Sequence, residues 1–132
     1  MLDSQGKLRV RAYTAGGALP VEDAVVRIKG AEEDNRFVSY SLLTDRDGIT
    51  SAVSLPAPSL SYSLAPSPAE APFALYDVEI IADGYYSKRI NGVSVFSGVE
   101  SVQLANMIPV SSGAGEYPRG NVNAIIPPSD SL

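Results

Sequence analysis

An all-β sandwich is the fold class that this sequence predicts, and three observations predict it. Apolar and polar residues alternate with a period of two in several short segments, as in strands that have one face on a core. Residues that favour turns recur between these segments. Apolar residues do not recur at i, i+3, i+4 and i+7 over a useful window, so helix is at most incidental. We therefore expect about seven short strands in an antiparallel sandwich.

The first half of the chain predicts four strands. Apolar residues alternate with basic ones over residues 7–13, and the alternation resumes over residues 24–29 after a break rich in glycine. Residues 36–44 are rich in β-branched and aromatic side chains, which favour strands. Asp45-Arg46-Asp47-Gly48 then favours a tight turn, and residues 51–55 form the returning strand.

The second half opens with the clearest strand of the chain, over residues 76–82. Two dipeptides, Asn91-Gly92 and Ser97-Gly98, are typical of two-residue hairpin turns. Three more strands are predicted around them, over residues 85–90, 93–96 and 99–108.

The 132 residues have room for one domain. We expect an N-terminal arm over residues 1–6 and the β-sandwich over residues 7–110. Residues 56–72 are rich in proline, which lacks the N–H that a strand ladder needs, and they predict an extended surface loop. Residues 111–132 predict an extended C-terminal tail.

Composition argues against several classes of partner and of site. A net charge of -5 repels nucleic acid, and no apolar run approaches the roughly 20 residues of a membrane span. The chain has no histidine and no cysteine, which removes the commonest general base, the thiol nucleophiles and the commonest zinc ligands. We expect no enzyme, no catalytic residue and no cofactor, although a Ser/Lys pair or a carboxylate pair stays formally open.

Two acidic clusters invite a calcium interpretation, and for both a simpler one is favoured. Alternate carboxylates before Gly48 resemble the start of a calcium-binding loop, but residues 49–55 hold no acid to complete it. A plain turn is therefore predicted there, with no metal site. Glu32, Glu33 and Asp34 are predicted to form a solvated hairpin tip.

Aromatic residues suggest a ligand platform. Tyr86 and Phe96, with Tyr85, are candidates for a surface that binds a sugar or a peptide. Neighbouring residues of a strand point to opposite faces, so one of Tyr85 and Tyr86 is expected in the core and the other at the surface.

Three sequence stretches resemble the carboxypeptidase regulatory-like, or transthyretin-like, domain family. They are residues 17–28, with a Pro-Val-x-x-Ala-x-Val pattern, residues 44–48, with Thr-Asp-x-x-Gly, and residues 76–85, which end in Gly-Tyr. The likeness spans roughly residues 7–110 and implies a seven-stranded Greek-key sandwich. Members are usually modules appended to other proteins, and the fold does not give the function. The hormone-binding and urate-hydrolase branches use a histidine that this chain lacks, so no site is carried over from them.

The tail predicts self-association. Ser111 to Gly115 reads as a flexible hinge, and Asn121 to Ile126 alternates like a strand. Extended, the tail reaches about 70 Å, whereas the radius of gyration of the domain is about 14 Å. The predicted contacts with a neighbouring subunit are Val122, Ala124, Ile125 and Ile126 from the tail, and Leu60, Tyr62, Leu64 and Phe73 from the proline-rich loop. In the alternative interpretation both segments fold back on their own domain.

Together these observations predict a structural subunit that self-assembles into a homopolymer, an extracellular or surface filament. The alternative is an accessory module that binds carbohydrate or peptidoglycan in a cell-wall or spore-associated system. Residues 1–6 show no basic or apolar region of a secretory signal, so a cell or spore surface location implies another export route or release from the cytoplasm.

Overall fold

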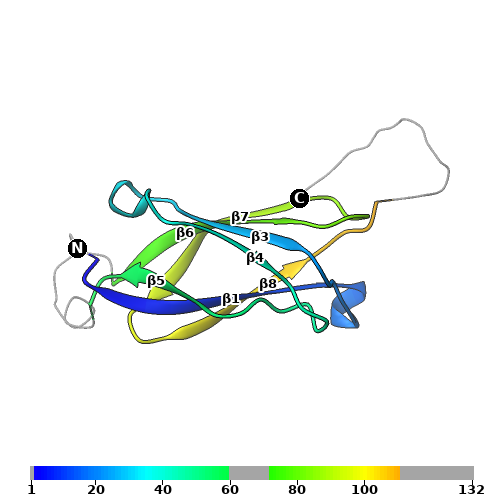
Figure 1. Ribbon diagram of the computed structural model, residues 1–132, viewed down its shortest axis with the longest axis horizontal. Helices are drawn as coiled ribbons and strands as arrows, with labels where there is room; N and C mark the ends of the chain where they lie inside the picture. The colour runs from blue at the N-terminus through cyan, green and yellow to red at the C-terminus, as the bar shows by residue number, and fades with distance from the viewer. Residues whose placement is uncertain (1, 60–71, 111–132) are drawn as a thin grey trace.

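Two β-sheets packed face to face form the part of the chain that the computed structural model describes, residues 2–59 and 72–110 (Figure 1). Helix in these residues is confined to two 3-10 turns. The predicted all-β sandwich is confirmed, but one of its strand pairs is parallel and not antiparallel as predicted. In chain order the elements are β1 (Ser4–Thr14), η1 (Ala15–Gly17), β2 (Leu19–Pro20), β3 (Val25–Gly30), η2 (Glu33–Asn35), β4 (Ser39–Leu43), β5 (Val53–Ala57), β6 (Phe73–Ile81), β7 (Lys88–Phe96) and β8 (Glu100–Asn106).

The first sheet is built around β1. On one side β1 pairs antiparallel with β5 near its start and with β2 at its end. On its other side β8 pairs with it in parallel, from Lys7 opposite Glu100 to Tyr13 opposite Asn106. Because Ser4 already pairs with Ala57, β1 begins three residues before the predicted Lys7, and part of the expected N-terminal arm belongs to the sheet.

The second sheet has the strand order β4-β3-β6-β7, and every neighbouring pair in it is antiparallel. The strand predicted over residues 76–82 is β6, one of the two inner strands. Its inward-facing residues Tyr76, Val78 and Ile80 are fully buried, because a strand between two neighbours in a sandwich has one face on the core. The core continues across the facing residues of the first sheet, Leu8, Val10, Ala12 and Leu55.

The Asn91-Gly92 hairpin prediction is wrong. Residues 88–96 form one continuous strand, β7, and these two residues lie opposite Asp77 between the pairs Tyr76 with Val93 and Val78 with Ile90. Two residues against one define a β-bulge, and Gly92 takes the positive φ of 73° that a glycine bulge uses. The Gly92 N–H donates to Asp77 Oδ1 at 3.1 Å. The same dipeptide serves hairpins and bulges, since both need a left-handed residue.

Ser97-Gly98 does form a tight turn, but it does not close a hairpin. Val99 N–H donates to Phe96 O at 3.2 Å, and Gly98 has a φ of 72°. The strand that follows pairs with β1 rather than β7, so the turn carries the chain from one sheet to the other. The Gly98 N–H fixes this crossing by donating to Gln5 O at 2.9 Å.

The Asp45–Gly48 turn is confirmed, and the carboxylate of Asp45 serves its geometry. Asp45 Oδ1 accepts the N–H groups of Asp47 and Ile49 at 2.8 and 3.1 Å, as short carboxylates do in turns. Gly48, at a φ of 77°, allows the turn to lie against the backbone of β1, where its carbonyl accepts the Ala12 N–H.

The second acidic cluster is more than a solvated tip. Glu32 Oε1 accepts the Leu75 N–H of β6 at 3.0 Å, and the fully buried Asn35 donates to the Leu75 carbonyl at 2.9 Å. Beside them Tyr76 is fully buried and donates its hydroxyl to Pro56 O at 2.6 Å, linking the two sheets. Burial raises the pKa of Tyr76 from about 10 to about 12, because the buried phenolate would lose its hydration.

Candidate functional site

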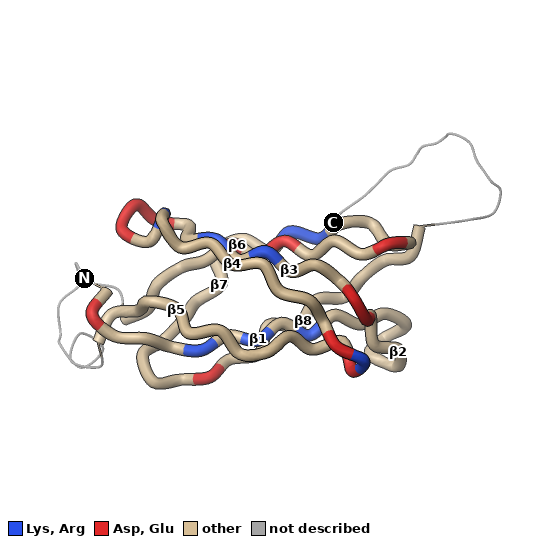
Figure 2. The backbone as a smooth tube through the Cα atoms, in the orientation of Figure 1, with Lys and Arg blue, Asp and Glu red and all other residues tan. Residues whose placement is uncertain are grey.

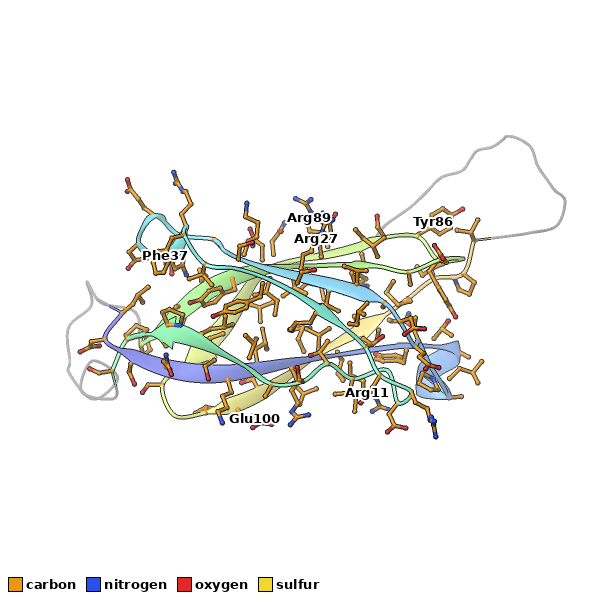
Figure 3. The ribbon with its side chains drawn as sticks, in the orientation of Figure 1. Arg11, Arg27, Phe37, Tyr86, Arg89 and Glu100 are labelled. Atoms are coloured by element: carbon orange, nitrogen blue, oxygen red, sulfur yellow. The ribbon has the colours of Figure 1, made fainter. Side chains whose placement is uncertain are left out.

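The structure does not bring Tyr86 and Phe96 together. Tyr86 precedes the first residue of β7 and Phe96 is its last, so they lie at opposite ends of a nine-residue strand. At roughly 3.3 Å per residue the two Cα atoms are about 30 Å apart. Tyr86 is 57% exposed and points outward (Figure 3), while Phe96 packs its ring against Phe73 at 5.4 Å between centroids. One joint platform is therefore not formed.

The predicted assembly contacts divide between described and undescribed residues. Phe73 is not in a loop but is the first residue of β6, where it is half-buried opposite Phe96. The other seven lie outside the described residues, and their contacts remain predictions: Leu60, Tyr62, Leu64, Val122, Ala124, Ile125 and Ile126.

A surface that the sequence did not single out lies along β8. This strand pairs with β1 on one side only, and no described strand pairs with its other side. We refer to that side of Glu100–Asn106 as the β8 edge. Figure 1 shows β8 at the margin of its sheet.

The hydrogen bonds to β1 decide which β8 groups face the edge. Lys7 N–H donates to Val99 O at 2.9 Å, and Met107 N–H donates to Tyr13 O at 2.7 Å. In a parallel ladder, alternate residues of a strand point both backbone groups at the same neighbour. The odd-numbered residues of β8 therefore face β1. The even-numbered ones, Glu100, Val102, Leu104 and Asn106, turn their N–H and C=O groups to the β8 edge.

Two of these edge residues have exposed apolar side chains. Val102 is 51% exposed and Leu104 is 50% exposed, on the outer face of the sheet. Their neighbours across the pairing are Arg9 and Arg11. An apolar pair beside unpaired backbone groups is the arrangement that invites another strand.

One side chain already lies on the β8 edge. Gln103 Nε2 donates to the Leu104 carbonyl at 2.9 Å. That carbonyl is one of the acceptors that an incoming strand needs. Gln103 thus caps part of the edge while leaving the N–H groups of Val102 and Leu104 uncapped.

One ion pair lies near the β8 edge. Arg9 Nε lies 2.9 Å from Glu100 Oε2, and both side chains are partly exposed. Arg11 lies 6.0 Å from the ring centroid of Tyr13. Figure 2 shows basic residues mostly on the strands and acidic ones mostly in the connections, and Figure 3 shows Arg11 and Glu100 on the same outer face.

The sequence holds the signal of alternation over residues 99–108, but alternation gives the face of a strand and not its partner.

The outer face of the other sheet carries a shallow charged depression of about 300 Å³. Glu79 lies between Arg27 and Arg89 in the pairing, and Arg89 Nη2 is 3.5 Å from Glu79 Oε2. Lys29 lies opposite Asp77, whose carboxylate accepts the Gly92 N–H. Such alternating charges across strands stabilise a solvated sheet face.

The described residues hold no candidate metal site and no candidate membrane-spanning helix. No group of three or more acidic, histidine or cysteine side chains there is placed to hold a metal ion. No helix among them has the length and apolar character needed to cross a membrane.

Comparisons with known proteins give the fold and no family. No protein-family model and no curated protein sequence matches the chain. Among solved structures the chain is similar to the Bacillus anthracis TIE protein, with a TM-score of 0.53 and 19% identity over 81% of this chain and 17% of that one. It is also similar to 3-chlorocatechol 1,2-dioxygenase from Rhodococcus opacus 1CP, with a TM-score of 0.53 and 13% identity over 82% of this chain and 62% of the enzyme.

A third likeness is to GBS52, the minor pilin of Streptococcus agalactiae, with a TM-score of 0.47 and 14% identity over 89% of this chain and 49% of the pilin. That score is too low to carry an argument. The chain spans less than two thirds of the length of each of these three proteins. None of them is described as a carboxypeptidase regulatory-like or transthyretin-like domain, so that resemblance stays a prediction. The first two likenesses support a class of fold, the β-sandwich module, which one enzyme and one other protein share.

Proposed function

We propose that this chain is a non-enzymatic structural subunit that self-assembles through its C-terminal tail, residues 111–132, docking on a neighbouring subunit. One observation carries the proposal: the β8 edge combines the exposed side chains of Val102 and Leu104 with backbone groups that no described strand pairs. Natural sheets commonly protect such edges with charges, bulges or covering segments. An edge left open in this way supports a role in pairing between chains.

The geometry of such a contact is heterologous. The tail of one copy would meet a different surface on the next, and contacts of this type propagate into a filament unless the rotation closes a ring. A filament at a cell or spore surface is the setting we propose. The carbohydrate-binding alternative loses its best candidate site, because Tyr86 and Phe96 lie at opposite ends of β7.

Truncation tests this function. Removal of residues 111–132 should give a folded monomer, because the buried core residues of the described part of the chain lie between Leu8 and Met107. Removal of Ser129 to Leu132 alone is the matched control, since it retains the strand-like residues 121–126. Sedimentation velocity over a range of concentrations measures the outcome. Assembly of the longer truncation to the same extent as the full chain would refute the proposal.

A further inference from the structure

We propose that residues 121–126 of one copy add to the β8 edge of another copy as an extra strand of the first sheet. This inference rests on the proposed function and assigns it a specific surface. The partner is a second copy of this chain, and its recognition chemistry is main-chain hydrogen bonding joined to apolar contact.

The lengths of the two segments agree. Residues 121–126 form a six-residue segment without proline, and β8 is a strand of seven residues. Pro127 and Pro128 follow directly and have no N–H to donate, so the ladder must end there. Residues 121–126 are therefore long enough to pair with most of β8, and the pairing would end at Pro127.

The side chains also agree. Val122, Ala124 and Ile126 share one face of an extended strand, because successive side chains alternate. Placed beside β8, that face continues the outer surface formed by Val102 and Leu104. Each half of the contact then covers apolar side chains that the other exposes.

The described chain leaves the first sheet before the tail begins. After β8 the chain crosses to the second sheet, where Tyr86 N–H donates to Ile108 O at 2.9 Å and Val110 N–H donates to Gly84 O at 2.9 Å. Residues 111–132 therefore start beside the β6–β7 connection, at the C-terminal end of β8. A tail of 22 residues that starts there can reach the β8 edge of a neighbouring copy, because it extends to about 70 Å.

Two complementary variants test the contact between copies. The variant with Val102→Lys and Leu104→Lys keeps its tail but loses the apolar edge. The chain truncated after residue 110 keeps the edge but has no tail. Each alone should be monomeric, and their mixture should form a 1:1 heterodimer and nothing larger, as measured by sedimentation velocity.

Each other outcome has a definite meaning. If the mixture stays monomeric while the full chain assembles, the tail does not dock on the β8 edge of another copy, and the inference is wrong. If the lysine variant assembles as the full chain does, the β8 edge is not the docking site, although the proposed function survives when the truncated chain is monomeric. If the truncated chain itself assembles, the proposed function fails.

A matched substitution controls for charge and exposure. Leu43 lies on β4, an edge strand of the other sheet, and is 61% exposed. Leu43→Lys should assemble within about twofold of the unmodified chain. The double lysine variant should lose at least about tenfold in apparent affinity, because a charge must then lie against apolar surface. Thermal unfolding followed by circular dichroism verifies that all variants are folded, and equal losses for both would contradict the proposal.

Discussion

β7 and β8 are edge strands of the two sheets, and they differ in how they are protected. β7 carries the Asn91-Gly92 bulge and two basic residues, Lys88 and Arg89, all of which disfavour pairing with another strand. β8 is regular, contains one charged residue, Glu100, and exposes Val102 and Leu104. Features that disfavour pairing with another chain are therefore present on β7 and largely absent from β8.

The largest expected effect concerns the stability of the sandwich and not the pairing of its edges. It comes from the buried residue Tyr76. Burial raises the pKa of Tyr76 from about 10 to about 12, so above pH 10 the unfolded chain ionises while the folded chain does not. The neutral Tyr76 side chain therefore makes its full contribution to stability below pH 10, and this contribution is lost as the pH rises to 12. The free energy of unfolding should fall by about 2–3 kcal/mol from this group. Urea titrations across this pH range measure the decrease.

Two phenylalanine variants isolate the contribution of Tyr76. Tyr76→Phe should remove this part of the pH dependence, at a cost near neutral pH of about 1 kcal/mol for the lost hydrogen bond to Pro56 O. Tyr86→Phe, at an exposed site, should retain the full decrease of the unfolding free energy with pH. If the unfolding free energy of both variants decreased equally with pH, Tyr76 would not be the group that causes the decrease.

The bulge in β7 gives the next largest effect. Gly92 has a φ of 73°, and a Cβ added there would meet no other atom within 4 Å, so the strain of Gly92→Ala lies in the backbone alone. We expect a loss of about 1–2 kcal/mol in the free energy of unfolding. Asn91→Ala is the neighbouring control and should change it by less than about 0.5 kcal/mol. A neutral Gly92→Ala would mean that β7 does not hold the bulge in solution.

Only part of the fold can be read from the sequence. The strand around residues 76–82 is predicted because alternation directly reports a half-buried face. The Asn91-Gly92 bulge is not, since bulge and hairpin require the same backbone conformation and only the pairing with Asp77 distinguishes them. The parallel pairing of β8 with β1 joins residues about 93 positions apart, and no local pattern encodes it.

The same reasoning applies to the candidate site. Tyr86 and Phe96 are visible as aromatic residues, but their separation depends on the length of β7. Val102 and Leu104 read as ordinary alternating strand residues, and they become a site only because no described strand covers the β8 edge. Sequence therefore indicates the types of residue that are present, and topology decides which of them are left unpaired.

A smaller effect is expected at Gln103, whose side chain lies on the β8 edge. Its amide donates to the Leu104 carbonyl on the β8 edge, and Gln103→Met keeps the length of the side chain but cannot donate. We expect assembly to strengthen by roughly fivefold, about the value of one net hydrogen bond. Gln5→Met on β1 is the control. Weaker assembly of Gln103→Met would show that the amide supports the contact rather than competes with it.

The smallest effect is expected at the exposed pair of Arg9 and Glu100. Their atoms lie 2.9 Å apart, but partly exposed ion pairs contribute at most about 1 kcal/mol. A double-mutant cycle with Arg9→Ala and Glu100→Gln should give a coupling free energy below about 0.5 kcal/mol. A coupling of several kcal/mol would indicate that this pair, rather than strand pairing, organises the β8 surface.

Residue-resolved hydrogen exchange of the full chain tests the central claim most directly. The amides of Val102 and Leu104 face the open edge, while those of Ser101 and Gln103 face β1. Raising the concentration from dilute monomer to assembled protein should slow exchange at Val102 and Leu104 and leave Ser101 and Gln103, already protected, nearly unchanged. If the amides of Val102 and Leu104 exchange equally fast in both states, no strand adds to β8 and the account is wrong.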